Sequence, residues 1–236
     1  MNGAEWVLHN SSWLARISRA FIPEIDAFGR CLAERMLPAF SSIGHEADLV
    51  EKATYDALGA WAQEYDDPAR DCQQAFDKGI SFMMMMRDIQ QGTINLFAAG
   101  LYHLCAQQLL LMYRRSGGRM FKQLDEKKVI EQLLKAGIPL KSFRSWKRVN
   151  ELRLLANAVK HGDGRSCSEL KELRPDLFVS PLDRDLGNAG RCRGIPVEQP
   201  VLGQGIYLDQ GQFESYVECV KEFWQELASA LDAASR

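Results

Sequence analysis

The chain has 236 residues, of which 46% are hydrophobic and 25% charged, and its formal net charge at pH 7 is −2. This composition excludes a disordered or fibrous protein, and the length fits one large domain or one and a half small ones. The six cysteines are scattered without a C-x-x-C pair, which predicts reduced thiols, a cytoplasmic protein and no metal site. The N-terminal residues lack the pattern of a signal peptide.

Apolar residues recur at helical spacing over most of the chain, so we expect an all-α fold. Helices are predicted over 4–20, 23–40, 45–65, 68–115, 124–136 and 142–161, the longest interrupted near Gly79 or Gly92. Residues 1–65 are expected to pack as N-terminal helices on a bundle formed by 66–236. The methionine run at 83–86 is expected to fill the core.

A last helix is predicted after Asp209 and Gln212, which form a plausible capping pair. Its apolar stripe comprises Phe213, Tyr216, Val217, Val220, Phe223, Trp224, Leu227 and Leu231. Before it, residues 174–210 hold four of the eight prolines and are predicted to form a long irregular loop, either functional or a surface excursion with a short strand at 206–208.

Residues 89–113 contain no Asp, Glu, Lys or Arg and are long enough to span a bilayer. They do contain six strongly polar side chains, which would be costly in hydrocarbon. We therefore predict a core helix of a soluble bundle that turns these side chains to its outer edge, and no membrane contact. Residues 66, 67 and 71 are acidic and lie beside Pro68, where they are expected to cap a helix.

Charge is distributed unevenly along the chain. Residues 114–165 hold 14 Lys and Arg against five Asp and Glu, a balance of +9, which leaves −11 for the remainder. Such a block suits a face that binds a polyanion, because neutralising phosphates releases condensed counterions. The alternative is that the acidic flanks fold against the block and cancel its field.

The end of this block carries the strongest local feature. On a helix at about 100° per residue, one polar stripe is formed by Asn150, Arg153, Asn157, Lys160 and His161, opposite an apolar arc. Leu154 and Ala158 flank the stripe, so we expect it to be only partly solvated, and Gly162 provides a helix stop.

Two explanations of the stripe stay open. In the functional one, His161 exchanges a proton near neutral pH, Arg153 and Lys160 stabilise phosphate charge, and Asn157 orients the imidazole or the substrate, as in a metal-independent ribonuclease. In the structural one, His161 is a cation that stabilises the helix C-terminus, and Arg153 and Asn157 satisfy buried carbonyl groups.

The segment from Glu151 to Gly162, ELRLLANAVKHG, resembles the signature helix of the HEPN superfamily, α-helical bundles found in bacterial toxins, phage-defence proteins and RNA-processing factors. The segment LYHLCAQQ, residues 101–108, resembles the long helix against which that signature packs. The resemblance covers about residues 80–235. It implies an Arg, four to six residues and a His, with two protomers joining their motifs in a metal-independent endoribonuclease.

Asn157 and His161 match the Asn-x-x-x-His half of this motif, but Ala156 stands where the family has Arg. Arg153 lies one turn earlier, with seven residues before His161. It either reaches the same phosphate from there or the site is inactive.

The sequence thus predicts a HEPN-like, homodimeric RNA-binding protein without a cofactor. Catalytic roles fall to Arg153, Asn157 and His161, and RNA contacts to Lys147, Arg148, Lys160 and Arg165. The alternative function is a non-catalytic helical adaptor for nucleic acid or for a protein partner, such as an antitoxin or a defence ATPase.

Overall fold

A computed structural model describes residues 12–59, 67–115, 125–187 and 196–234. These residues form helices and connections without a β-strand, which confirms the all-α prediction. The main helices are α2 (Ser12–Arg16), α3 (Ile22–Cys31), α4 (Ile43–Gly59), α5 (Pro68–Arg115), α6 (Glu126–Lys135), α7 (Trp146–His161), α8 (Arg165–Leu173), α9 (Pro181–Asp185) and α10 (Gln210–Ala234).

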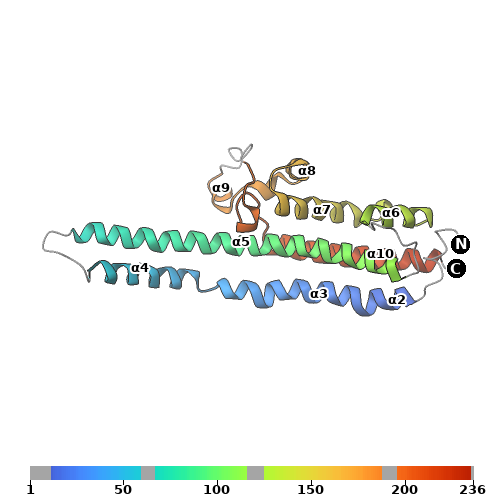
Figure 1. Cartoon of the computed structure of the whole chain (residues 1–236), viewed down its shortest axis with the longest axis horizontal. Coiled ribbons are helices and arrows are strands. Elements are labelled where there is room, and N and C mark those ends of the chain that lie inside the picture. Colours follow the sequence, from blue (N-terminus) through green and yellow to red (C-terminus); the bar gives the residue numbers. More distant parts are fainter. Residues whose placement is uncertain (1–11, 60–66, 116–124, 188–195, 235–236) are drawn as a thin grey trace.

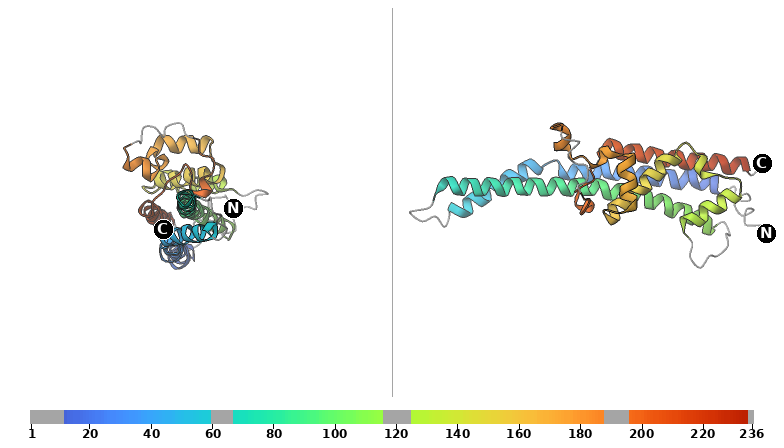
Figure 2. Two further views of the ribbon diagram at one scale, coloured as in Figure 1. Left: turned by 90° about the vertical axis from the view of Figure 1, so that its left-hand side faces the viewer. Right: turned by 90° about the horizontal axis from the view of Figure 1, so that it is seen from above.

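Helix α5 is the spine of the molecule, and its two halves have different neighbours. Figure 1 shows α4 alone beside the N-terminal half, whereas α3, α7 and α10 pack along the C-terminal half. We call α4 with residues 68–88 the arm, and the remaining described elements the body. The view from above in Figure 2 shows the same division, with the arm projecting from the body.

The core lies in the body. It joins α5, α7 and α10 to the N-terminal helices, and its largest fully buried side chains include Trp224, Tyr113, Tyr216, Phe21 and Phe213. Phe21 packs on Trp224 with ring centroids 4.7 Å apart, and Lys221 of α10 pairs with Asp26 of α3. Burial of aromatic side chains provides most of the stabilisation at such a junction.

The break predicted between residues 20 and 23 is absent. α2 passes through a π-helical turn, η1 (Ile17–Phe21), directly into α3, because Pro23 occupies the first turn of α3, where a missing N–H costs no hydrogen bond. A second π turn, η2 (Leu32–Met36), and the 3₁₀ turn η3 (Leu37–Phe40) lead on towards α4. Residues 4–11 of the first predicted helix lie outside the described ranges.

The predicted interruption of α5 near Gly79 or Gly92 is wrong, since the helix is continuous over 48 residues. Both glycines allow a neighbour to approach closely instead. A Cβ on Gly92 would lie 2.0 Å from the carbonyl oxygen of Val201, and one on Gly79 would lie 3.1 Å from the carbonyl oxygen of Ala47. Glycine is used here for close packing and not for a bend.

The apolar part of α5 makes it the one helix, among the residues described, that is long and apolar enough to cross a membrane, and half of this stretch is buried inside the fold. We predicted that the polar side chains of α5 lie at its outer edge, and this prediction is wrong for two of them. Asn95 and Gln108 are buried, and each donates hydrogen bonds to neighbouring segments. The methionine prediction is also wrong for Met84 and Met85, which are 61% and 52% exposed on the arm.

The connection from 174 to 209 is more regular than predicted. It contains η5 (Pro175–Phe178), α9 and η6 (Pro200–Leu202), while residues 188–195 lie outside the described ranges. No strand forms at 206–208, where Ile206 and Leu208 are fully buried. Asn95 fastens the connection to α5 by donating to the carbonyl oxygens of Pro200 and Ile206, each at 2.9 Å.

Two predicted local features are confirmed. Asp209 and Gln212 form a reciprocal cap at the start of α10, with N–H to side-chain oxygen distances of 2.7 and 3.0 Å. Asp67 accepts a hydrogen bond from the backbone of Ala69 at the start of α5, whereas residue 66 is outside the described ranges. The cysteines at 31, 72, 105, 167 and 219 are free thiols.

Candidate nucleic-acid interface

The position of α7 is fixed at both ends. The Glu226 carboxylate of α10 accepts hydrogen bonds from the backbone N–H groups of Arg144 and Ser145 and from the Ser145 hydroxyl, at 2.6 to 3.1 Å. These contacts fix the backbone that leads into α7 and place a carboxylate near the positive end of the helix dipole. At the other end Gly162, with φ of +68°, stops the helix as predicted, and the carbonyl oxygen of Val197 lies against it.

The apolar side of α7 is wider than the sequence indicated, because Leu154 and Ala158 are fully buried together with Leu152, Leu155, Ala156 and Val159. The polar stripe is correspondingly narrow. Asn150, Arg153 and Asn157 are half-buried, while Lys160 and His161 are exposed. The stripe is therefore only partly solvated, as predicted, and its solvation increases towards the end of the helix.

Arg153 and Asn157 face a cleft of about 630 Å³ between α5, α6, α7 and α8. The cleft is lined by Tyr102, Asp125, Glu126, Lys127, Ile130, Trp146, Arg153, Asn157, Arg165, Ser166 and Glu169. Three of the seven site residues predicted from the sequence, Arg153, Asn157 and Arg165, meet there. His161, Lys160 and Lys147 are exposed on α7 but do not line the cleft.

The polar side chains of the cleft are each held at one end and open at the other. Arg153 donates from Nε to Asn150 Oδ1 at 3.0 Å, and Asn157 donates from Nδ2 to Ser166 Oγ at 3.4 Å. Arg165 pairs through Nε with Glu169 at 2.8 Å. Within the described residues the terminal nitrogens of both guanidinium groups have no partner, so they remain available to an anion.

Tyr102 and Glu126 form the wall opposite α7. The tyrosine hydroxyl donates to Glu126 Oε2. Burial raises the pKa of Tyr102, and the neighbouring Glu126 carboxylate raises it further, whereas the charge of Arg153 lowers it. The phenol therefore stays protonated and serves as a hydrogen-bond donor that orients the carboxylate.

Arg148, predicted to bind nucleic acid, is directed to the other side of α7. Its guanidinium carbon lies 4.8 Å from the centre of the Tyr216 ring, and Nη2 donates to Ser215 Oγ at 2.7 Å. On that side the buried Glu151 carboxylate accepts hydrogen bonds at 2.5 Å from Arg174 and from Tyr216. Arg148, half-buried and 3.8 Å from Glu151, thus belongs to a polar network around this buried carboxylate that fixes α7 on α10.

The acidic flanks cancel part of the basic block. Glu226 of α10 lies 3.6 Å from the Arg144 guanidinium, whereas Asp163, an acid of the block, pairs with Lys171 of the following segment at 3.0 Å. Residues 119 and 122, two further cations of the block, lie outside the described ranges. Both sequence explanations therefore hold locally: some cations are paired within the protein, and others are presented around the cleft.

His161 is the last residue of α7, the position in which the structural explanation places it. It makes no hydrogen bond or ion pair with any described residue, so its ring nitrogens are open to solvent. Arg153 and Asn157 bind side chains and not buried carbonyl groups, which disagrees with the other half of that explanation.

Sequence reasoning missed the far wall of the cleft. Tyr102, Glu126 and Ser166 come from three other helices, and no local spacing connects them to α7, whereas Trp146 lies on α7 itself at i, i+7 spacing from Arg153. One signal was present for Ser166, because a helix stop at Gly162 followed by a short turn must return the next helix towards Asn157.

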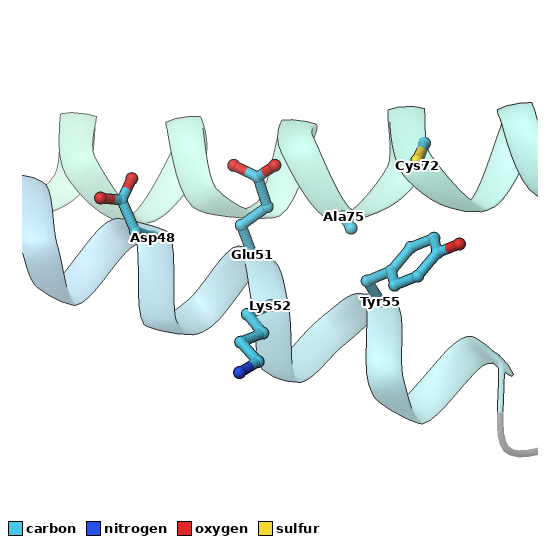
Figure 3. Close-up of a pocket in the computed structure, with 6 residues that line it drawn as sticks. All are labelled: Asp48, Glu51, Lys52, Tyr55, Cys72 and Ala75. Atoms are coloured by element: carbon cyan, nitrogen blue, oxygen red, sulfur yellow. The ribbon is translucent and has the colours of Figure 1, made fainter.

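A second hollow lies on the arm between α4 and α5, lined by Asp48, Glu51, Lys52, Tyr55, Cys72 and Ala75. Figure 3 shows Asp48 and Glu51 pointing towards α5 and Lys52 pointing away from it. None of the predicted site residues contributes to this hollow. Across the residues described, no three His, Cys, Asp or Glu side chains gather in a way that would hold a metal ion.

Comparison with known proteins adds no match: no family model matches the chain, and neither a curated protein nor a solved structure is significantly similar to it.

Proposed function

We propose that the protein binds single-stranded RNA, and that the cleft beside α7 is the central part of the binding face. The observation that carries this proposal is the meeting of Arg153, Asn157 and Arg165, each with open polar atoms, beside the partly exposed ring of Trp146. Cations that contact phosphate and an aromatic ring on which a base stacks are the two components of single-strand recognition.

The exposed cations Lys147 and Lys160 extend this face along α7. They contribute through charge and not through fixed geometry. Replacing either lysine with alanine is therefore expected to weaken RNA binding modestly, and by the same factor for all RNA sequences. Arg153 has a partly fixed side chain, and its loss is expected to cost more.

The test is fluorescence anisotropy of a labelled single-stranded RNA at two salt concentrations. We expect Arg153→Ala to weaken binding by about tenfold and to reduce the salt dependence. The matched control is Lys135→Ala, which removes an exposed cation of α6 that does not line the cleft. The proposal is overturned if the wild-type protein binds no RNA, or if both variants bind RNA with the same affinity as the wild type.

Cleavage of the bound RNA extends the same proposal. His161 lies one turn beyond Asn157 and is unpaired within the described residues, so it is free to exchange a proton with a 2′-hydroxyl or a leaving 5′-oxygen. No metal is needed, because RNA contains its own nucleophile. We expect end-labelled RNA to be cut in EDTA by the wild type and not by His161→Ala or Arg153→Ala.

The resemblance to the HEPN superfamily adds a homodimer to this proposal, in which two α7 faces share one RNA. Sedimentation measured with and without RNA tests it. A wild-type dimer that becomes a monomer when the α7 face is mutated supports a shared site. A wild-type monomer that binds and cuts RNA contradicts the homodimer.

The second candidate function is a non-catalytic adaptor that binds a protein partner. It is favoured by the exposed apolar side chains of the arm, which include Leu49, Phe76, Met84 and Met85. Such exposure marks interaction surfaces. Comparing the RNA affinity of arm variants with that of cleft variants distinguishes the two functions. If the cleft is the functional site, substitutions in the arm should leave RNA binding unchanged.

A further inference from the structure

The charge balance of the cleft indicates what kind of ligand fits it. Its three cations, Lys127, Arg153 and Arg165, are matched by three carboxylates, Asp125, Glu126 and Glu169. A neutral cleft does not concentrate a phosphate chain by its field alone. The ligand that fits must therefore offer hydrogen-bond donors to the carboxylates as well as an anion to the cations.

Of the three carboxylates, Glu126 alone forms no ion pair within the described residues, whereas Asp125 pairs with Lys128 and Glu169 with Arg165. Asp125 caps α6 by accepting from the Lys128 N–H at 2.9 Å, and Glu169 is paired with Arg165. Glu126 is held through Oε2 by the Tyr102 hydroxyl, while Oε1 has no partner among the described residues. Tyr102 thus fixes the orientation of a carboxylate whose Oε1 is open and whose Oε2 keeps a second lone pair, so the group can still accept from two donors.

The other groups of the cleft are those that bind the remaining parts of a nucleotide. Trp146 lines it with a partly exposed indole ring, on which a base can stack. The terminal nitrogens of Arg153 suit a phosphate, and Asn157 Oδ1 is a further open acceptor. All three side chains lie on α7, a rigid element, so their mutual placement is fixed.

The four RNA bases differ in what they present to a carboxylate. Guanine offers two adjacent donors, N1–H and the N2 amino group, along its Watson–Crick edge. Adenine and cytosine place a ring-nitrogen acceptor beside their amino donor, and uracil flanks its one N–H with two carbonyl oxygens. A carboxylate therefore attracts guanine and is repelled by an acceptor of each other base.

We propose that the cleft selects a guanine nucleotide of the RNA, with Glu126 accepting from N1–H and the N2 amino group, Trp146 stacking on the base, and Arg153 contacting the phosphate. This inference rests on the proposed RNA-binding function and adds the substrate preference. Tyr102 acts as a positioning residue, since it contacts Glu126 through its hydroxyl.

The test compares two labelled RNA hexamers that differ only in one central G or A, together with the free 5′-monophosphates GMP, IMP and AMP as competitors. We expect the wild type to prefer the G-containing RNA by about tenfold, as a well-placed two-donor contact provides. IMP lacks the N2 amino group and should compete less well than GMP, and AMP least.

Glu126→Gln should remove the preference for G, because an amide offers a donor where the carboxylate accepts. Glu131→Gln is the matched control, as it changes an exposed carboxylate of the same helix that does not line the cleft. Tyr102→Phe keeps the Glu126 carboxylate but removes the hydroxyl that orients it, so part of the preference for G should survive.

The outcomes separate the two proposals. RNA binding with equal affinity for G and A, or a preference that survives Glu126→Gln, overturns the guanine inference and leaves RNA binding standing. Failure of both RNAs to bind overturns the proposed function itself. Loss of the preference in Glu126→Gln with retention in Glu131→Gln supports the inference, provided that circular dichroism shows both variants folded.

Discussion

The two halves of α5 belong to one uninterrupted helix but differ in how they are stabilised. In the body the buried residues of α5 include Leu101, Tyr102, Cys105, Leu109 and Met112, whereas between residues 68 and 88 only Ala75 and Gly79 of α5 are buried. Between residues 68 and 88, α4 covers one side of α5, and the other sides of α5 are in water. A continuous helix can therefore cross from a packed core into a region with little tertiary stabilisation.

The same contrast separates the functional candidates. The cleft is built on body helices whose ends are fixed by hydrogen bonds, which suits directional recognition. The arm presents apolar side chains and a shallow hollow, which suits contact with another protein. Substitutions that affect only one region test this division.

The largest expected difference comes from one identical change in the two regions. Phe213→Ala removes a side chain that is 1% exposed in the body and should lower the free energy of unfolding by about 3–5 kcal/mol. Phe76→Ala removes one that is 48% exposed on the arm and should change it by less than about 0.5 kcal/mol. Urea unfolding followed by circular dichroism measures both. Equal losses would contradict the contrast.

The next effect concerns the buried network that holds α7. Glu151→Ala removes the acceptor of both Arg174 and Tyr216. We expect a loss of about 2–3 kcal/mol, below that of a fully buried pair because Arg174 keeps Asp176 at 2.7 Å. Thermal unfolding measures it, with Glu169→Ala, a surface carboxylate paired with Arg165, as the control. A loss no greater than the control would mean that the network is not stabilising.

A smaller effect is expected from adding one methyl group. Gly92→Ala would place a Cβ 2.0 Å from the backbone carbonyl oxygen of Val201, which should cost about 1–3 kcal/mol and loosen the connection at 200–202. Gly44→Ala on the arm meets nothing within 4 Å and should be neutral or stabilising by up to about 0.5 kcal/mol. Proteolysis and urea unfolding of both variants provide the comparison. If Gly44→Ala lowered the stability and Gly92→Ala did not, the close packing inferred at Gly92 would be wrong.

The smallest effect depends on pH. Hydrogen bonding to Arg174 holds the pKa of Asp176 below its usual value. The resulting stabilisation is present above the unfolded pKa of about 4 and is lost as the pH falls through the lowered folded value. Between pH 7 and pH 2 the wild type should therefore lose more stability than Asp176→Asn. Identical acid profiles would show that this pair contributes nothing to the pH dependence.

Periodicity predicted most of the helices correctly, because α7 and α10 each have one apolar side, and Gly162 marks a clear stop and Asp209 a clear start. It placed breaks in α5 at Gly79 or Gly92, where close packing and not a bend requires glycine, and between residues 20 and 23, where Pro23 fits the first turn of α3. It could not distinguish the buried Asn95 from an exposed amide, since that depends on the carbonyl groups of a connection more than 100 residues away.

The candidate site was predictable only along one helix. The stripe on α7 follows from helix geometry, and two of its members, Arg153 and Asn157, do line a cleft. The partners of that stripe on other helices could not be predicted, because Tyr102 and Glu126 reach the cleft through the packing of α5 and α6 against α7. The opposite orientation of Arg148 depends on Tyr216, 68 residues further along the chain.

Hydrogen–deuterium exchange with and without single-stranded RNA tests the central claim most directly, because it reports the body and the arm in one experiment. The account predicts RNA-dependent protection at residues 126–130, 146–157 and 165–169, with no change in α4 or at residues 68–88. Protection confined to the arm, or none anywhere at saturating RNA, would contradict it.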